Sequence, residues 1–354
     1  MSRKTVLLGP YPPPYGGVSI YIQTLYDCFK DRGVEFWTFG DQEFEGPNIH
    51  FMKDKRRDLV PLVWRRGANA RIADCTHFLL EYPSVLVPMW IALKALLRFE
   101  WIKIIQDGSL PARYKEFSPI RKALFRLAVQ YATEFIVISE ELEGWLRQEI
   151  QVKQKISLIK NLLPVPYRAT SEPLPEGHRQ GVTAYQNSSK RVCSIGVFIP
   201  SYGFKHVAMA VELLRKETGI DIGLLLLDGD FATEQSYRRE VLDGRDWITV
   251  LKNLPRPLVF GILGRSDVFV RAVEAEGYGL SRVEAIWSGL PVVATRAGET
   301  RGMLLFDFGN VDELVIQLRK ALFGPPMADG EKWAAMYQAE AEQNLQELAN
   351  RLGI

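Results

Sequence analysis

Short apolar runs alternate with longer helical patterns along the whole chain, and this alternation constrains the fold more than any other feature. Residues 5–8 form the first apolar run, and residues 18–31 carry an apolar stripe with helical spacing. Strands that alternate with helices are typical of a parallel sheet with helices on both faces. The pattern occurs twice, in residues 1–165 and 191–330. The sequence therefore predicts an α/β protein with two Rossmann-like, doubly wound parallel-sheet domains.

The expected elements follow this pattern in each half. In the first half we expect strands at residues 5–8, 76–80, 102–105, 135–138 and 156–159, and helices at 18–31, 86–97, 118–131 and 140–149. In the second half we expect strands at 191–197, 223–227, 248–251, 268–270 and 291–294, and helices at 205–217, 257–265 and 281–288. Residues 166–190 are rich in Pro, Ser, Gln, Gly and charges, which predicts a linker between the two domains.

Charge and cysteine content exclude several classes of protein. The 44 Lys and Arg residues against 42 Asp and Glu residues give a net charge of +2, which argues against nucleic acid as the main partner. The excess is uneven, at +5 in residues 1–165 and −3 in the rest. Three cysteines without a C-x-x-C spacing support neither a disulfide framework nor a zinc site. We therefore expect a reducing, cytoplasmic environment.

The apolar stretch at residues 79–99 is the strongest candidate for a membrane span. Glu81, Pro83, Pro88 and Lys94 interrupt it, so it falls short of a spanning helix. We expect no segment that crosses a membrane.

The motif with the clearest chemistry is EGYGLSRVEA, at residues 276–285. Glu276 stands in a glycine-rich turn after an expected strand, and Glu284 lies about one turn inside the next helix. Both carboxylates are therefore expected at the carboxyl edge of the sheet, where open α/β sheets bind ligands. The N–H groups of Gly279, Leu280 and Ser281 begin that helix, and its dipole favours an anion such as a diphosphate. A carboxylate can accept hydrogen bonds from paired sugar hydroxyls.

This motif, with the following SGLPVVAT at residues 288–295, resembles the family 4 (group 1) retaining glycosyltransferases of the two-domain B-type fold. The resemblance implies two domains that face each other across a cleft. It also implies that the C-terminal helix, residues 331–354, crosses back to the first domain. The resemblance further implies that Glu276 contacts the transferred sugar and that Glu284 contacts the ribose. The other donor-binding residues that it implies in this motif are Tyr278, Gly279, Leu280 and Ser281.

Residues 9–17, GPYPPPYGG, resemble the first loop of that family. The resemblance implies that Gly16 and Gly17 let the backbone approach the donor diphosphate from the N-terminal domain. A simple turn is an equally good interpretation of this loop taken alone.

Three positions depart from the family pattern. Val197 and Tyr202 stand where the family usually has an Arg and a Lys that grip the diphosphate, and Lys205 and Arg271 are the candidate substitutes. Gln106 stands where family members often carry a His. Gln can donate and accept hydrogen bonds but cannot relay a proton at neutral pH. The candidate catalytic residues are thus Glu276 and Gln106.

The expected reaction uses a nucleotide sugar as co-substrate and no cofactor. The acceptor is a saccharide or a lipid-linked molecule, which would enter beside Gly16, Gly17 and Gln106. Asp228-Gly229-Asp230 resembles the Asp-x-Asp metal site of a single-domain glycosyltransferase fold, but that fold leaves the second domain unexplained, so we expect no metal. Two alternatives stay open. One is a nucleotide-sugar epimerase of the same fold, and the other is a catalytically weak homologue that scaffolds another transferase.

The helix expected at residues 118–131 suggests a membrane contact. Its spacing places Ile120, Leu124, Leu127, Ala128 and Tyr131 on the core stripe, and leaves Phe125 and Val129 beside Lys122 and Arg126. Apolar residues among cations suit an anionic membrane surface. We expect peripheral binding at the inner face of the plasma membrane, with a solvated basic face as the alternative.

Overall fold

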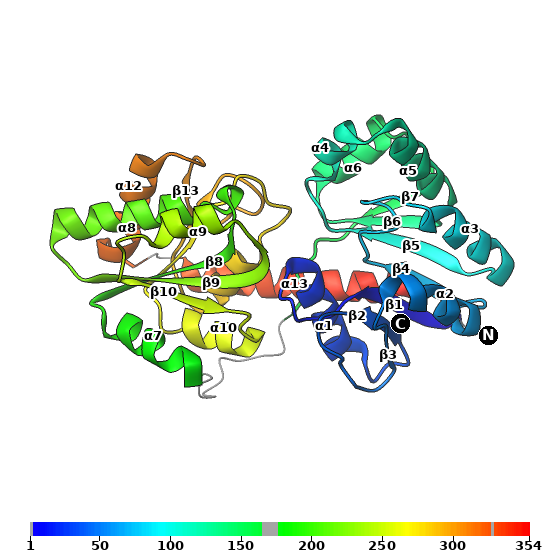
Figure 1. Cartoon of the computed structure of the whole chain (residues 1–354), viewed down its shortest axis with the longest axis horizontal. Coiled ribbons are helices and arrows are strands. Elements are labelled where there is room, and N and C mark those ends of the chain that lie inside the picture. Colours follow the sequence, from blue (N-terminus) through cyan, green and yellow to red (C-terminus); the bar gives the residue numbers. More distant parts are fainter. Residues whose placement is uncertain (1–2, 165–175, 327–328) are drawn as a thin grey trace. The chain divides into compact units, whose positions relative to one another are not determined.

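The chain consists of two compact units, each built on one parallel sheet (Figure 1). The computed structural model describes residues 3–164, 176–326 and 329–354. The N-terminal unit comprises residues 1–164 and 341–354, and the C-terminal unit comprises residues 165–340. Helices connect successive strands in both units, so the prediction of two Rossmann-like α/β domains is confirmed.

The N-terminal sheet has the strand order β3-β2-β1-β4-β5-β6-β7. Its strands are β1 (Thr5–Pro10), β2 (Glu35–Phe39), β3 (Ile49–Phe51), β4 (Arg71–Asp74), β5 (Glu100–Ile105), β6 (Glu134–Val137) and β7 (Lys155–Leu158). The helices of this unit are α1 (Gly17–Phe29), α2 (Lys55–Arg66), α3 (Leu86–Leu97), α4 (Leu110–Glu116), α5 (Pro119–Tyr131) and α6 (Glu140–Gln148). All pairings are parallel, so the carboxyl ends of the strands lie at one edge.

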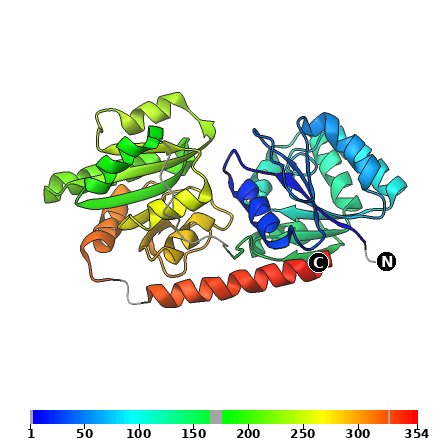
Figure 2. The same ribbon diagram turned by 90° about the horizontal axis from the view of Figure 1, so that it is seen from below.

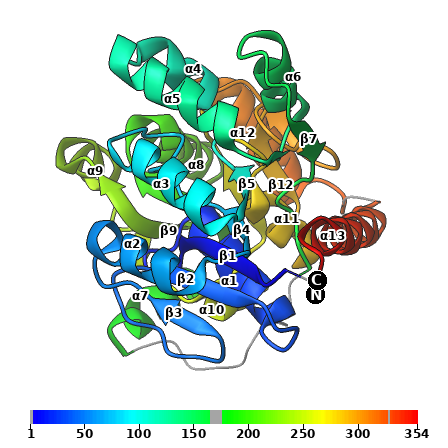
Figure 3. The same ribbon diagram turned by 90° about the vertical axis from the view of Figure 1, so that its right-hand side faces the viewer.

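Two apolar layers cover this sheet. Helices α2 to α6 pack over one face, with buried residues such as Trp90, Phe125 and Leu146. Helix α1 and the end of α13 (Gly330–Leu352) pack over the other face through Leu25, Leu348 and their neighbours. Figure 3 shows α13 well apart from α4 and α5, in agreement with these two layers.

Three expectations for this unit are wrong. The strand expected at 76–80 lies earlier, at β4, and residues 76–80 form no strand. Strands β2 and β3 were not expected because they are short, and helix α2 was not expected because Pro61 breaks the usual sequence pattern of a helix. The core stripe of α5 was misassigned in part, because Ala128 is buried and Leu124 and Leu127 pack against the core as expected, whereas Ile120 and Tyr131 do not.

In α5, Phe125 and Val129 face the core, whereas Ile120 and Tyr131 are exposed to 74% and 44%. The Phe125 ring packs against Trp145 at a centroid distance of 5.9 Å. The helix carries two apolar stripes, and this aromatic contact from another helix determines which one turns inward.

The C-terminal sheet has the strand order β10-β9-β8-β11-β12-β13. Its strands are β8 (Lys190–Phe198), β9 (Ile222–Thr233), β10 (Ile248–Lys252), β11 (Val268–Arg271), β12 (Val292–Thr295) and β13 (Leu304–Phe306). Its helices are α7 (Glu176–Asn187), the single 3-10 turn η1 (Pro200–Tyr202), α8 (Phe204–Thr218), α9 (Gln235–Leu242), α10 (Arg256–Leu263), α11 (Leu280–Trp287) and α12 (Val311–Phe323). Helices α8, α9 and α12 lie over one face, and α7 and α10 lie over the other (Figure 1).

Part of the segment expected as a linker is helical. Residues 165–175 lie outside the described residues, but α7 occupies Glu176–Asn187 and packs against β9 and β10. The Tyr185 hydroxyl lies 2.7 Å from the Ser266 hydroxyl, and both residues are buried. The polar composition of this segment therefore hides one buried helix face.

Helix α13 is a single continuous helix that belongs to both units (Figure 2). Near its end, the Asn344 amide donates a hydrogen bond of 3.1 Å to the Leu162 carbonyl, and the Thr5 hydroxyl donates one of 2.9 Å to the Leu352 carbonyl. Within the described ranges, no helix is both long and apolar enough to span a bilayer.

Candidate donor and acceptor sites

The turn between β11 and α11 forms the centre of the C-terminal site. Residues 268–271 are fully buried in β11, so the segment after Arg271 emerges at the carboxyl edge of the sheet. Gly279 precedes α11 with φ of +91°, a conformation that favours glycine. The Glu299 N–H donates a 2.8 Å hydrogen bond to the Tyr278 carbonyl and fixes the turn from the next loop. The first turn of α11 thus points its N–H groups toward this edge.

Glu276 is paired with Arg271. Two guanidinium nitrogens of Arg271, Nε and Nη2, donate to Glu276 Oε2 at 2.9 and 2.6 Å. Arg271 also donates to the Ile195 carbonyl, and its guanidinium lies 5.0 Å from the centroid of the Tyr202 ring. Burial lowers the pKa of Arg271, but the Glu276 carboxylate raises it more, so the net pKa lies above the usual value. Arg271 therefore holds its positive charge beside the turn.

Glu284 is also paired with an arginine, one that the sequence did not single out. Arg256 begins α10, and its Nε and Nη2 donate to Glu284 Oε1 at 2.8 and 2.5 Å. Both side chains are buried. Because a buried charge costs several kcal/mol without a partner, this pair fixes the Glu284 carboxylate in place. The contact spans 28 positions of sequence, and no local pattern marks it.

Lys205 points toward α9. Its Nζ lies 2.8 Å from Glu240 Oε2, and its backbone N–H donates to the Tyr237 hydroxyl at 3.0 Å. These residues line a cavity of about 390 Å³, together with His206, Glu274 and Phe308. The two candidate substitutes for the missing cations therefore differ. Arg271 lies against Tyr202 and Glu276, whereas Lys205 is paired with a different helix.

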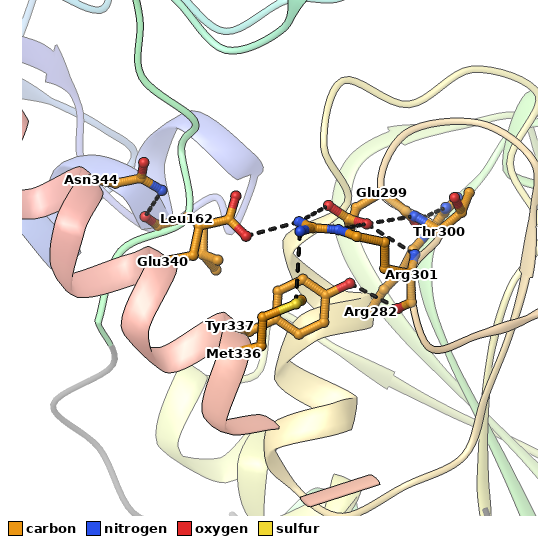
Figure 4. A network of polar contacts seen from close by, with 9 residues as sticks. All are labelled: Leu162, Arg282, Glu299, Thr300, Arg301, Met336, Tyr337, Glu340 and Asn344. Carbon is orange, nitrogen blue, oxygen red and sulfur yellow. Dashed lines mark hydrogen bonds and ion pairs between the residues drawn. The ribbon is translucent and has the colours of Figure 1, made fainter. Parts of the chain in front are cut away.

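A second layer of contacts supports the turn from behind (Figure 4). Arg301 Nη2 lies 2.6 Å from Glu299 Oε2 and 2.8 Å from Glu340 Oε2 on α13. The Tyr337 hydroxyl donates to the Arg301 carbonyl at 2.8 Å. Burial would raise the pKa of Glu299, but hydrogen bonds from the Arg301 side chain and from backbone N–H groups lower it to about 2. The loop at residues 296–302 is thus held to α13.

Gln106 lies at the carboxyl end of β5 in the N-terminal unit. Its amide nitrogen and oxygen are both buried, and neither has a hydrogen-bond partner within the described residues. A buried polar atom without a partner costs about 1–3 kcal/mol. Such an amide is suited to a hydroxyl group supplied by a ligand. Its neighbour Asp107 is already bound, because Arg113 Nη1 lies 2.6 Å from Asp107 Oδ2.

A buried charge cluster at the same edge was missed by the sequence analysis. Lys103 Nζ lies 3.2 Å from Glu81 Oε2 and 3.6 Å from Asp74 Oδ2, and all three side chains are buried. His77 Nδ1 lies 3.6 Å from Glu81 Oε1, and its side chain is 38% exposed. Burial would lower the pKa of Lys103, but the two carboxylates raise it. Lys103 comes from a separate segment of the chain, and no local pattern marks the cluster.

Gly16 and Gly17 begin α1. The Gly16 N–H donates to the Ser19 hydroxyl at 2.9 Å, and that hydroxyl donates to the Pro14 carbonyl at 2.7 Å. A Cβ atom on either glycine would meet nothing within 4 Å. Packing within the chain therefore does not require glycine here, which favours close approach of a ligand. Among the residues that the structure describes, no group of His, Cys, Asp or Glu side chains is arranged to hold a metal ion.

Comparisons with known proteins agree with the two-domain fold. Residues 180–330 match the model of the family described as glycosyl transferases group 1. HepE from Anabaena, solved with UDP and glucose, matches over 99% of this chain and 100% of that chain, with a TM-score of 0.71 and 16% identity. A trehalose-phosphate synthase from Burkholderia xenovorans, solved with glucose-6-phosphate, matches over 99% of this chain and 100% of that chain, with a TM-score of 0.73 and 14% identity. WaaG, a glycosyltransferase involved in lipopolysaccharide biosynthesis, matches over 98% of this chain and 99% of that chain, with a TM-score of 0.69 and 14% identity. No curated protein matches in sequence.

The fold is that of the B-type glycosyltransferases, with two Rossmann-like domains. Residues 180–330 are similar to the group 1 glycosyl transferases. The predicted resemblance to this family is thereby confirmed for residues 180–330, and the match supports the prediction of a nucleotide-sugar-dependent glycosyltransferase.

We predict that Gly17→Ala separates stability from activity. Alanine favours a helix start over glycine and has open space here, so the melting temperature should stay the same or rise slightly. If the diphosphate approaches this backbone, KM for the donor should rise about tenfold. Gly144→Ala in α6 is the matched control, because a Cβ there also meets nothing within 4 Å. Equal donor KM in both variants would rule out the loop as a phosphate site.

Proposed function

We propose that this chain is a retaining hexosyltransferase, which transfers a sugar from a nucleoside-diphosphate donor to a saccharide or lipid-linked acceptor. We place the reaction in the synthesis of a cell-surface polysaccharide or lipopolysaccharide. The observation that carries the proposal is the pair of arginine-held carboxylates, Glu276 and Glu284, on the two sides of the start of α11. The UDP-glucose complex of HepE supports the donor class, and the lipopolysaccharide role of WaaG supports the pathway.

Each residue has a proposed role. Glu276 accepts hydrogen bonds from the transferred sugar, and Glu284 accepts them from the ribose. The diphosphate binds at Tyr278, Gly279, Leu280 and Ser281, at the N-terminus of α11. The acceptor binds the N-terminal unit, where the unpaired Gln106 amide and the backbone of Gly16 and Gly17 are available.

The chemistry follows from where charge develops. The bond between the sugar carbon and the phosphate oxygen breaks, and the acceptor oxygen bonds to that carbon from the same face. Its proton passes to the leaving diphosphate. Negative charge grows on the diphosphate, so catalysis consists mainly of stabilising this charge and orienting the acceptor. Arg271 and the first turn of α11 supply positive potential there.

A panel of donors tests the proposal. The protein is incubated with UDP-, GDP- and ADP-sugars, each alone and with saccharide acceptors or lipid-linked acceptors in vesicles. A transferase forms a glycosylated product only when an acceptor is present, and the anomeric configuration of the product shows retention. Conversion of a donor to its epimer without acceptor identifies the epimerase instead. Nucleotide binding without any product favours the scaffold.

We predict that the two glutamates affect different kinetic constants. A ribose contact exists in the ground state and in the transition state, so Glu284→Gln should raise the donor KM about tenfold with little change in kcat. A contact at the reacting sugar matters more in the transition state, so Glu276→Gln should lower kcat about 100-fold. Glutamine keeps an oxygen for the buried arginine, which alanine would leave unpaired. Wild-type kinetics in both variants would reject the site.

We predict that Arg271, and not Lys205, replaces the missing diphosphate cations. A buried diphosphate without a cation would cost several kcal/mol, and Arg271 already lies against Tyr202, where the family usually has its lysine. A crystal structure with bound nucleoside diphosphate should place the Arg271 guanidinium about 3 Å from a phosphate oxygen. Lys205→Met is the matched control and should change donor affinity less than about twofold. If neither cation reaches the phosphates, the scaffold gains support.

We also propose that the N-terminal unit binds an anionic membrane at the cytoplasmic side of the plasma membrane. The exposed residues of α5 differ from those expected, but they again combine apolar side chains with cations. Ile120 and Tyr131 are exposed beside Arg121 and Arg126. Trp64, exposed to 58% on α2, lies in the helix layer over the same sheet face. Apolar side chains among cations suit a membrane interface, and each cation contributes about 1 kcal/mol at an anionic leaflet.

Sedimentation with phosphatidylglycerol vesicles at low salt tests this surface. We predict that Arg121→Glu with Arg126→Glu weakens binding at least about thirtyfold, and that Ile120→Ser weakens it further. Lys122 is a poorer choice because it packs over the Tyr114 ring at 5.6 Å. The control pair is Ile316→Ser with Lys320→Glu, an exposed isoleucine and a cation on α12. Failure of the wild type to sediment with the vesicles would remove the membrane proposal and leave the transferase intact.

A further inference from the structure

Arg282 on α11 is fully buried, and neither the sequence motif nor the proposed function assigns it a role. Its Nη1 donates hydrogen bonds to the carbonyl oxygens of Thr295, at 3.2 Å, of Ala297, and of Glu299, at 2.9 Å. Its Nη2 lies 3.4 Å from the Thr295 hydroxyl. All these partners belong to residues 295–299, which comprise the last residue of β12 and the loop after it. One side chain thus determines the path of that loop.

The same loop holds the donor turn. The Glu299 N–H donates to the Tyr278 carbonyl at 2.8 Å, and the Thr295 hydroxyl donates to the Val273 carbonyl at 2.7 Å. A Cβ atom on Gly298 would lie 2.9 Å from Cγ of Glu276, so the loop packs directly against the glutamate. Arg282 therefore fixes the turn through the loop.

The guanidinium also lies directly beneath the start of α11. A Cβ atom on Gly279 would be 3.1 Å from Nε of Arg282. This Nε is buried and has no hydrogen-bond partner within the described residues. Burial lowers the pKa of Arg282 to about 10, so the group stays protonated at neutral pH. A positive charge is thus placed under the N–H groups that begin the helix.

The other arginines of this region are paired with carboxylates. Arg256 pairs with Glu284, Arg271 pairs with Glu276, and Arg301 pairs with two glutamates. Among the described residues, Arg282 makes hydrogen bonds only to carbonyl and hydroxyl oxygens and no ion pair with a carboxylate. Carbonyl dipoles offset its charge only in part, and a nearby anion would be attracted strongly because the surroundings are dry.

We propose that Arg282 is a positioning residue of the donor site, whose buried guanidinium fixes the Glu276–Gly279 turn and attracts the donor diphosphate to it. This inference rests on the proposed function, because it assumes that the diphosphate binds at this turn. It explains how the site manages with Val197 and Tyr202 where the family usually has two cations. Arg282 acts through the backbone and does not itself contact the ligand.

Calorimetry with nucleotides tests the proposal. The probes are UDP, GDP and ADP, each compared with its nucleoside. Arg282→Met removes the charge and keeps a long side chain, and it should weaken binding of the preferred diphosphate at least about tenfold. Binding of the matching nucleoside should change less than about twofold, because it carries no phosphate. Arg282→Lys keeps the charge and should recover affinity to within about threefold of the wild type.

Arg301→Met is the matched control. It loosens the same loop from the α13 side but removes a cation that is already paired with two carboxylates. A purely structural role of Arg282 predicts that both methionine variants weaken nucleoside and diphosphate binding alike, and that result would overturn the proposal. Unchanged diphosphate affinity in Arg282→Met would overturn it as well.

A third variant covers the case in which Arg282→Met does not fold. Arg282→Gln keeps an N–H donor for the loop carbonyls but carries no charge, and it should show the same selective loss of diphosphate affinity. If Arg282→Lys binds the diphosphate no better than Arg282→Gln, the charge has no role and the proposal fails. A wild-type protein that binds none of the nucleotides would instead refute the proposed function itself.

Discussion

Buried guanidinium groups organise the carboxyl edge of the C-terminal sheet. Arg256, Arg271 and Arg282 come from three different elements, and all three are buried within the same region. A charge in a dry environment costs several kcal/mol unless hydrogen bonds and opposite charges compensate it. Each guanidinium therefore needs fixed partners, which here are two glutamates and the carbonyls of one loop. These contacts fix the geometry of the turn between β11 and α11.

The sequence predicted this site where the information is local. The alternation of strand and helix around residues 268–294 is regular, and the glycine-rich turn lies between two clear elements, so β11, α11 and β12 were found. The partners were not predictable. Arg256 and Glu284 are 28 positions apart, and Arg282 meets its carbonyls only because β12 lies beside β11. A single sequence gives no signal for such contacts.

The N-terminal unit was harder to predict for a different reason. Strands β2 and β3, at one end of its sheet, have 5 and 3 residues, too few for a periodic pattern, and α2 contains a proline. Residues 76–80 end in three apolar residues but leave the sheet, because Asp74 at the end of β4 accepts a 2.7 Å hydrogen bond from the Thr76 N–H and bends the chain. Lys103 is then enclosed between Asp74 and Glu81, a contact that depends on the register of β4 with β5.

The origin of Arg271 has a consequence for how the donor is held. In the family pattern the cations follow the first strand of the domain, whereas Arg271 ends β11 and is bonded to Glu276. The proposed phosphate-binding arginine and the proposed sugar-binding carboxylate are therefore one ion pair. When a diphosphate binds, Arg271 must be shared between phosphate and carboxylate, because its Nη1 already donates to the Ile195 carbonyl. In our proposal, the positive charge of Arg282 beneath the turn attracts the diphosphate as well, so that Arg271 can keep its hydrogen bonds to Glu276 and hold this carboxylate toward the sugar.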